Sequence, residues 1–335
     1  MMKNIKKLMC ILLSAVCALL MCSCRSTDKL AFGTGGIGGN YYAYGSAYAQ
    51  LIGAENEKLS VEVKATAGSA ANLRLIQQGF LDIAVVQSDM LTEAYNGENS
   101  FAEMPCRSIR ALAALYTEEC QLIVRADSDI YTVSDLYGKT VSVGEEESGT
   151  LKDAELIMQL GGLVNGSVKK ENLSFSDSAA ALENGTIDAF FVTAGLPTTA
   201  VTELAKETAI RIVSLDEKII DRMTDGDSDY TVCTIPANTY AGQTEEVRTV
   251  GVKAVLVASG RISDDTAEQL VRILFDHSSE LHYATSASEF DVDFAVSGIS
   301  IPFHSGAAGF YEEQGVTVNT NADKAEIDRP SAAQD

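Results

Sequence analysis

The chain has 335 residues, of which 46% are hydrophobic and 21% charged, and Asp and Glu outnumber Lys and Arg by 47 to 25, for a formal net charge of −22. This length and composition exclude collagen-like, low-complexity and wholly disordered chains, and they allow two domains that each bury a core. The negative charge disfavours nucleic acid and anionic membrane surfaces as partners.

The first 23 residues have the pattern of a secretory signal peptide, with a lysine-rich start followed by an apolar run over residues 8–22. The run is shorter than the roughly 20 apolar residues that span a bilayer, which disfavours the alternative of a retained anchor. It ends in the letters MCSC, which resemble the lipobox of bacterial lipoproteins. Cys24 follows the small residue Ser23 and is the predicted lipid acceptor, which makes residues 24–29 a tether.

Three cysteines follow the predicted tether, Cys106, Cys120 and Cys233. An odd count allows at most one disulfide, and the alternative is a set of small buried thiols. Beyond the signal no CxxC pair occurs, so the sequence predicts neither a metal site nor thiol redox chemistry at these positions.

From residue 30 onward, short apolar runs alternate with segments of helical period. The predicted strands cover residues 30–33, 59–66, 81–87 and 109–116. The predicted helices between them cover residues 41–52, 69–78 and 90–95. Strands separated by helices form right-handed βαβ units with mainly parallel sheets.

The same alternation resumes at residue 140. The predicted strands cover residues 140–143, 173–175, 187–192 and 210–213, and the predicted helices cover residues 151–160, 178–183 and 197–206. A helix that ends at glycine, a G-x-x-D turn and an apolar strand occur in both halves, at Gly79 and at Gly185. This repetition favours two similar α/β lobes over one large sheet.

After residue 214 the pattern changes, with strands predicted over residues 230–236 and 250–258 and a helix over residues 264–275, capped by Ser263. The apolar strand and its helix need a sheet to bury against, and the first lobe is the candidate. The sequence therefore predicts an α/β fold with these parts: lobe 1 over residues 30–120 and 240–316, lobe 2 over residues 121–239, and a disordered tail over residues 317–335.

Glycines and hydroxyl groups recur where a predicted strand is followed by a helix. Residues 33–38 read GTGGIG and satisfy the dinucleotide fingerprint, but the next strand ends in Lys64-Ala65-Thr66, without the acid that would hold a ribose. Glycine turns still allow close approach of a ligand, and amides at a helix start favour a carboxylate or phosphate. Ordinary helix capping is the alternative for each motif taken singly.

Similar small polar residues occur at positions 67–72, 87–89, 147–150 and 193–195. Because ligands of open α/β sheets bind beyond the carboxyl ends of the strands, these motifs together predict one binding site between the lobes.

Several segments carry a resemblance to a known family. In chain order they are GTGGIGGNYY at 33–42, AGSAANLR at 67–74, VQSD at 86–89, ALY at 114–116, DLYGK at 135–139, SGT at 148–150, DAFF at 188–191, AGLP at 194–197 and PFH at 302–304. This ordered series resembles the TAXI branch (TRAP-associated extracytoplasmic immunogenic) of the solute-binding proteins of TRAP transporters. The resemblance covers about residues 30–315.

The resemblance implies a two-lobed receptor of the type II periplasmic-binding-protein-like fold, each lobe a mainly parallel sheet flanked by helices. Such a receptor is monomeric, needs no cofactor or metal, catalyses no reaction and is held outside the cytoplasm on a bacterial membrane by its N-terminal lipid. It closes around a small carboxylate-bearing solute, such as glutamate or 2-oxoglutarate, and delivers it to a multi-spanning TRAP permease.

Matching positions give the expected ligand contacts. They are Thr34, Gly35, Gly36, Ile37, Gly39, Asn40, Tyr41, Ser69, Asn72, Gln87, Ser88, Tyr116, Ser148, Gly149, Thr150, Thr193, Ala194 and Gly195.

One departure from the family pattern is the run Glu145, Glu146 and Glu147 before residues 148–150. Negative charge at a helix start satisfies the helix dipole by itself and would oppose an anionic ligand. Either the run faces solvent, or the ligand carries an amine or another cationic group.

Two other functions stay open on the sequence alone. A ligand sensor for a membrane signalling protein would bind solute equally well, and a secreted nucleotide-dependent enzyme could use the glycine-rich loop. The three histidines, His277, His282 and His304, show neither metal-pair nor catalytic motif spacing, which disfavours the enzyme.

Overall fold

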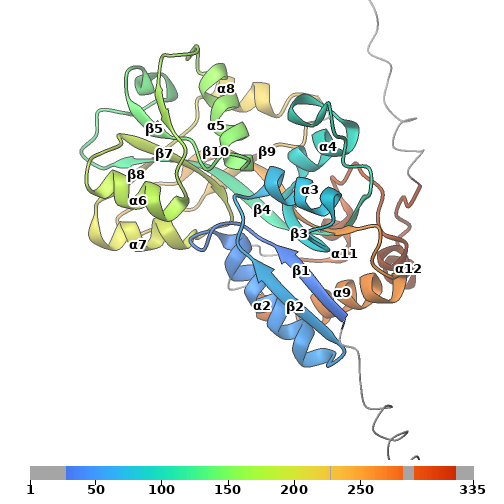
Figure 1. The fold of residues 1–335 in the computed structure, drawn as a ribbon. Helices are drawn as coiled ribbons and strands as arrows, with labels where there is room; N and C mark the ends of the chain where they lie inside the picture. Colours follow the sequence, from blue (N-terminus) through green and yellow to red (C-terminus); the bar gives the residue numbers. More distant parts are fainter. Residues whose placement is uncertain (1–27, 227, 282–289, 322–335) are drawn as a thin grey trace, which may run out of the picture.

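The computed structural model describes residues 28–226, 228–281 and 290–321. It has an α/β fold with two lobes, each of which packs helices against strands around its own apolar core (Figure 1). The predicted signal peptide and Cys24 lie outside the described residues. Within the described residues, no helix has the length and apolar character needed to cross a membrane.

Lobe 1 is built on three parallel strands in the order β2, β1, β3. These are β1 (Asp28–Gly33), β2 (Leu59–Lys64) and β3 (Ile83–Gln87). A helix follows each strand: α2 (Asn40–Glu55), α3 (Ser69–Gln78) and α4 (Ser88–Asn96), the last followed by a short 3-10 turn, η1 (Asn99–Phe101). The parallel arrangement brings the starts of these helices to one edge of the sheet, which faces lobe 2.

Lobe 2 repeats this plan with strands β5 (Thr140–Ser142), β6 (Lys169–Glu171) and β7 (Ala189–Ala194), which are parallel in the order β6, β5, β7. Its helices are α5 (Gly149–Leu160), α6 (Phe175–Glu183), α7 (Thr199–Glu207) and α8 (Glu217–Met223), with the turn η2 (Val133–Leu136) before β5. The strand predicted over residues 173–175 is wrong, because Ser174 caps α6 and Phe175 begins it.

Two long strands join the lobes, β4 (Ile109–Arg125) and β10 (Val247–Ser259), which pair antiparallel. Strand β4 also pairs antiparallel with β7 and with β8 (Ile210–Val213), and β10 with β3 and β9 (Thr231–Ile235). The sheet is therefore mixed, because the two strands that carry the chain between lobes run in opposite directions. A Cβ on Gly251 would lie 2.6 Å from Thr117 Cγ2, so glycine allows the close crossing there.

The remaining helices, α9 (Asp264–Asp276), α10 (Ser278–Leu281), α11 (Val292–Val296) and α12 (Ser305–Glu313), return to lobe 1. Ser263 caps α9 as predicted, since its hydroxyl accepts from the Thr266 amide at 3.1 Å. Tyr240 and Val247 pack in a core of lobe 2, whereas Ala254 packs in lobe 1. We propose that the chain passes between the lobes near residues 117–118 and again near residues 252–253. The second crossing lies beyond residue 240, where the sequence analysis places it.

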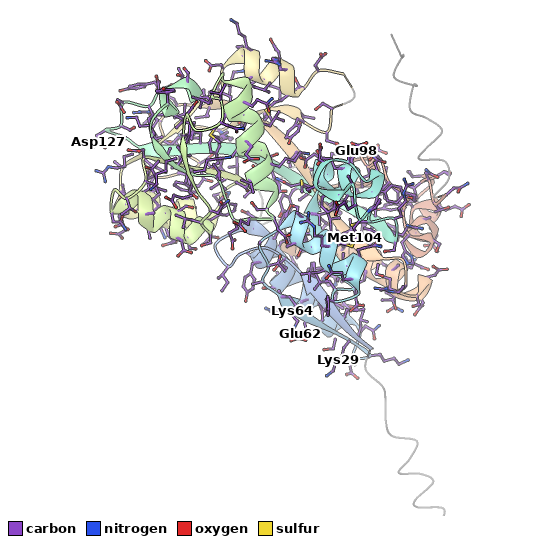
Figure 2. All side chains as sticks on the ribbon, turned by 45° about the horizontal axis from the view of Figure 1, so that its top comes forward. Lys29, Glu62, Lys64, Glu98, Met104 and Asp127 are labelled. Carbon is purple, nitrogen blue, oxygen red and sulfur yellow. The ribbon has the colours of Figure 1, made fainter. Side chains whose placement is uncertain are left out.

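Several charged side chains of this acidic chain lie on the outer surface. Lys29, Glu62 and Lys64 lie along the outer edge of lobe 1, and Asp127 lies at the far end of lobe 2 (Figure 2). The three cysteines after the predicted tether are free thiols, two buried and Cys233 half-buried. Of the predicted tail, residues 317–321 are described, and Asn319 accepts from the Phe303 amide at 2.7 Å, while residues 322–335 lie outside the described part.

Candidate functional site

A cavity of about 440 Å³ lies between the lobes, at the carboxyl ends of the strands. Both lobes contribute its walls. The lining residues from lobe 1 and from β4, which joins the lobes, are Gly35, Gly36, Ile37, Gly38, Gly39, Asn40, Tyr41, Ala67, Gly68, Ser69, Gln87 and Glu118. Those from lobe 2 are Glu145, Ser148, Gly149, Thr150, Ser174, Phe175, Ser176, Thr193 and Ala194.

The glycine-rich loop between β1 and α2 forms one wall and reaches the opposite lobe. The Ala200 amide of α7 donates to the Gly38 carbonyl at 3.2 Å. A Cβ on Gly38 would lie 2.4 Å from Ser176 Oγ, so a side chain at this position would push the lobes apart. The glycines of this loop therefore allow contact between two protein surfaces.

The start of α3 is completed from lobe 2. The amides of Ala70 and Ala71 donate to the Glu147 carbonyl at 3.0 and 3.2 Å. Gly68 precedes this helix with φ +124, a conformation that favours glycine. Because glycine has no side chain, this residue cannot cap the helix by a side-chain hydrogen bond. The first turn of a helix has unpaired amides, and here the other lobe pairs two of them.

The start of α5 forms the facing wall. Ser148 caps this helix by accepting from the Leu151 amide at 3.1 Å, and Thr150 Oγ1 accepts from the Thr193 amide at 3.2 Å. A Cβ on Gly149 would lie 1.3 Å from Gln87 Oε1, so these two residues of different lobes touch. The structure is thus a closed form in which both lobes enclose the cavity.

Glu118 is a buried carboxyl group that faces the cavity from β4. The Tyr41 hydroxyl donates to Glu118 Oε2 at 2.7 Å, and only 1% of Glu118 is exposed. Burial raises the Glu118 pKa well above its ordinary value, and the hydrogen bond from Tyr41 only partly offsets this. The negative charges of Asp153 and Asp89 raise it further.

The three consecutive glutamates before α5 face different ways. Glu145 is half-buried and lines the cavity, and burial followed by the nearby charge of Asp177 raises its pKa. Glu146 is exposed. Glu147 pairs across the lobes with Arg74, with 2.7 Å between Oε1 and Nη1. The run is therefore divided between the cavity, the solvent and the contact between lobes.

The cavity brings together thirteen of the residues that the sequence predicts as ligand contacts, and their contact with a ligand stays a prediction. They are Gly35, Gly36, Ile37, Gly39, Asn40, Tyr41, Ser69, Gln87, Ser148, Gly149, Thr150, Thr193 and Ala194.

Five predicted contacts lie behind the cavity wall, and two of them brace the glycine-rich loop. The Thr34 hydroxyl donates to the Lys64 carbonyl at 2.9 Å. The Asn72 amide donates to the carbonyls of Thr34 at 2.7 Å and Val85 at 2.9 Å. Both side chains are fully buried and hold strand ends together.

The other three support the wall in different ways. Ser88 begins α4 and is buried, with its carbonyl accepting from Thr92 Oγ1 at 2.9 Å. A Cβ on Gly195 would lie 3.1 Å from the ring of Tyr116, so these two residues pack on each other. The Tyr116 ring also packs against the Tyr44 ring in a tilted arrangement, with 5.7 Å between ring centroids.

Sequence reasoning missed several lining residues. Glu118 lies two residues beyond the strand predicted over residues 109–116, whereas β4 continues to Arg125 and buries it. Gly38 and Gly68 lie inside motifs that the sequence analysis identified. Ser174, Phe175 and Ser176 form the start of α6 in lobe 2, a segment that the sequence analysis predicted in part as a strand.

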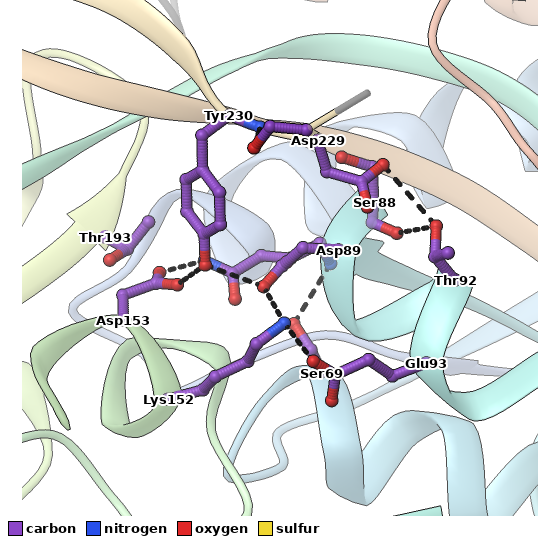
Figure 3. A network of polar contacts seen from close by, with 12 residues as sticks. Ser69, Ser88, Asp89, Thr92, Glu93, Lys152, Asp153, Thr193, Asp229 and Tyr230 are labelled. Atoms are coloured by element: carbon purple, nitrogen blue, oxygen red, sulfur yellow. Dashed lines mark hydrogen bonds and ion pairs between the residues drawn. The ribbon is translucent and has the colours of Figure 1, made fainter. Parts of the chain in front are cut away.

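Beside the cavity, a polar cluster that we call the interlobe network joins α4 of lobe 1 to lobe 2 (Figure 3). Its members are Asp89, Glu93, Lys152, Asp153 and Tyr230. Lys152 Nζ lies 2.5 Å from an Asp89 oxygen and 2.7 Å from a Glu93 oxygen. The Tyr230 hydroxyl lies between two carboxylates, donating to Asp89 at 2.9 Å or to Asp153.

Burial raises the pKa of two acids in and next to this network. The Asp153 pKa rises to about 7, and the adjacent charge of Asp89 contributes. The pKa of Asp229, whose carboxylate accepts from Thr92 Oγ1 at 3.4 Å, rises to about 6. Among the residues placed in the structure, no group of three or more His, Cys, Asp or Glu side chains is arranged to hold a metal ion.

Comparison with solved structures gives matches of low sequence identity. The substrate-binding protein of an amino acid ABC transporter is 16% identical over 77% of this chain and 97% of that chain, with a TM-score of 0.48. The periplasmic aliphatic sulphonate binding protein SsuA from Escherichia coli is 12% identical over 92% and 94%, with a TM-score of 0.46. The model of the NMT1-like family matches residues 32–315, and the chain belongs to this family.

Proposed function

We propose that this protein is an extracytoplasmic receptor that closes its two lobes around a small solute and delivers it to a membrane permease of the TRAP type. The observation that carries the proposal is the cavity, because its walls come from both lobes and bonds between the lobes lie next to it. Its volume of about 440 Å³ suits a small molecule.

The contacts between the lobes explain how binding would be sensed. Separation of the lobes would break the bonds from Ala70 and Ala71 to Glu147 and from Ala200 to Gly38. A solute that touches both walls favours the closed form, so binding shifts the population toward it. A permease that recognises the closed form would then accept only loaded receptors.

The proposed solute is a small carboxylate-bearing molecule of the glutamate or 2-oxoglutarate kind. Its carboxylate would accept from backbone amides at the starts of α2 and α5, which meet at the cavity. Gly39, which precedes α2, provides no side-chain cap for that helix. This role involves no covalent chemistry and no cofactor.

The proposed location follows from the N-terminal sequence. Export by the signal peptide and acylation of Cys24 would leave a monomer tethered to the outer side of a bacterial membrane, within reach of its permease. Mass spectrometry of the exported protein tests this part. A mature chain that begins at a residue other than Cys24, or carries no lipid, would contradict it.

A thermal-shift screen of the exported protein tests the receptor function. Amino acids, dicarboxylates, 2-oxo acids and nucleotides form the panel. A ligand of the folded state at a hundredfold excess over its Kd adds about 2.7 kcal/mol of stability, which gives a clear rise in Tm. The proposal predicts a rise with at least one small acid. A response to dinucleotides alone, or to no compound, would refute it.

A further inference from the structure

We propose that closure of the lobes takes up one proton from solvent, which Asp153 of the interlobe network holds while the lobes touch. The inference rests on the proposed receptor function and adds to it a dependence of solute binding on pH. It follows from the number of hydrogens that the contacts of the closed network require (Figure 3).

The Tyr230 hydroxyl makes more contacts than its single hydrogen can serve. Its oxygen lies 2.9 Å from Asp89 Oδ2 of lobe 1 and within hydrogen-bonding distance of Asp153 Oδ1 of lobe 2. A phenol has one hydrogen and an ionised carboxylate has none, so two ionised carboxylates would leave lone pairs facing each other at one contact. One of the two carboxyl groups must therefore bring a hydrogen of its own.

The surroundings of the two carboxyl groups select Asp153 as the protonated one. Asp89 Oδ2 also accepts from Lys152 Nζ at 2.5 Å, and Asp89 lies in the first turn of α4, where the helix dipole favours negative charge. Asp153 is 1% exposed, and its Oδ2 accepts at 3.1 Å from the neutral amide nitrogen of Gln87. Burial disfavours the ionised form of Asp153 and raises its pKa to about 7.

The bonds then form one chain across the closed lobes. Asp153 Oδ1 donates to the Tyr230 oxygen, and the Tyr230 hydroxyl donates to the Asp89 oxygen that Lys152 also binds. Tyr230 packs in a core of lobe 2 and Asp89 lies in lobe 1, so separation of the lobes breaks the chain at Asp89. The Tyr230 hydroxyl can then donate to an ionised Asp153, and the proton returns to solvent.

The groups that face the network cannot replace this proton with a second cation. They are Asp89 and Glu93 from α4, Lys152 and Asp153 from α5, Asp229 and Tyr230 from the segment before β9, and Glu118 and Cys120 from β4. Lys152 is the only basic residue among these described groups, and it is already paired with Asp89 and Glu93. Carboxylates outnumber cations in the closed network, so uptake of a proton relieves repulsion between them.

Isothermal titration of the exported protein with 2-oxoglutarate tests the inference. Both carboxylates of this probe stay ionised between pH 6 and pH 8. Titrations in two buffers of different ionisation enthalpy give the number of protons exchanged. Binding at pH 6 should take up about one proton, and the Kd should fall about tenfold from pH 8 to pH 6. Binding with no proton uptake and an unchanged Kd would overturn the inference.

The variant Asp153→Asn identifies the group that takes the proton. Its amide has the shape of the neutral carboxyl group, and it can donate to Tyr230 with Nδ2 and accept from Gln87 with Oδ1. We expect binding without proton uptake, and a Kd at pH 8 close to that of the wild type at pH 6. Proton uptake equal to that of the wild type would overturn the inference. Weak binding by the folded variant at both pH values would also overturn it, because the closed form would then require an ionised Asp153.

Two further variants separate the network from other acids. Glu118 is buried and faces the cavity, so Glu118→Gln can change the affinity, but the proton uptake should remain. Loss of the uptake in Glu118→Gln would overturn the inference and assign the proton to the cavity. Glu146→Gln, at an exposed position, is the matched control and should keep both the Kd and the uptake.

The two proposals fail in different ways. Absence of binding by every compound of the panel would overturn the receptor function and this inference together. If a different small acid of the panel binds, it replaces 2-oxoglutarate in the same titrations. Binding without proton uptake would leave the receptor function standing and overturn only the protonation of Asp153.

Discussion

Acidic side chains gather at two places between the lobes, and the two places differ in what the chain supplies. In the interlobe network, Lys152 and Tyr230 provide a cation and a hydroxyl to the carboxylates of Asp89, Glu93 and Asp153. In the cavity, Glu118 and Glu145 face a space whose described lining contains no basic residue. The network therefore contains a cation from the chain itself, whereas the described lining of the cavity contains none.

The largest expected effect comes from removing the cation of the network. Lys152→Met leaves the carboxylate of Asp89, which is 3% exposed, without its ion pair. The free energy of unfolding, measured in urea, should fall by about 3 kcal/mol, since loss of one partner strands a buried charge.

Lys170→Met is the matched control for that change. Its pair with Glu155 is 2.6 Å long but exposed, with 40% and 50% of the side chains accessible. Its loss should cost below about 1 kcal/mol. Equal effects of the two variants would show that the network does not depend on its cation.

The next effect acts on the cavity. Gly149→Ala would place a methyl carbon 1.3 Å from Gln87 Oε1, so the Gln87 side chain would have to leave its place in the wall of the closed cavity, while neither core is touched. Solute affinity should fall about hundredfold, which equals about 2.7 kcal/mol, with little change in the Tm of the unliganded protein.

Gly53→Ala is the control for that change. Gly53 lies exposed in α2, and a Cβ there would meet no atom within 4 Å. Solute affinity should stay unchanged, and stability should rise by up to about 1 kcal/mol, because alanine favours a helix more than glycine does. If Gly149→Ala binds solute as the wild type does, the contact between Gly149 and Gln87 is not needed for binding.

A smaller effect follows from pH. The pKa values of Asp153 and Asp229 rise to about 7 and about 6, so the folded state holds protons that the unfolded chain releases. Stability should therefore increase as pH falls from 8 to 6, by about 3 °C in Tm. Asp153→Asn should reduce this slope. A Tm that falls over the same range would contradict the assignment.

The smallest effect is expected at the surface bridge between lobes. Arg74 and Glu147 are 23% and 50% exposed, so solvent screens their attraction. A double-mutant cycle with Arg74→Ala and Glu147→Ala should give a coupling free energy of about 0.5 kcal/mol. A coupling free energy above about 2 kcal/mol would contradict this expectation. It would show that the Arg74–Glu147 pair is as strong as an ion pair of the buried interlobe network.

The alternation of strands and helices was predictable because each element repeats a local pattern of apolar residues. The site was predictable where it is built from local motifs, such as the glycine-rich loop and the start of α5. Asn72 shows the limit, since its polar side chain in a motif turns toward Thr34 and Val85 instead of the cavity. Glu118 and Phe175 reach the site only through contacts between distant segments, which no local pattern encodes.

The cap that Glu147 places on α3 has a further consequence. Since the amides of Ala70 and Ala71 are covered only while the lobes touch, their exchange with deuterated solvent requires opening of the lobes. The exchange rate of these two amides would therefore report how often the lobes open, without any label attached to the protein.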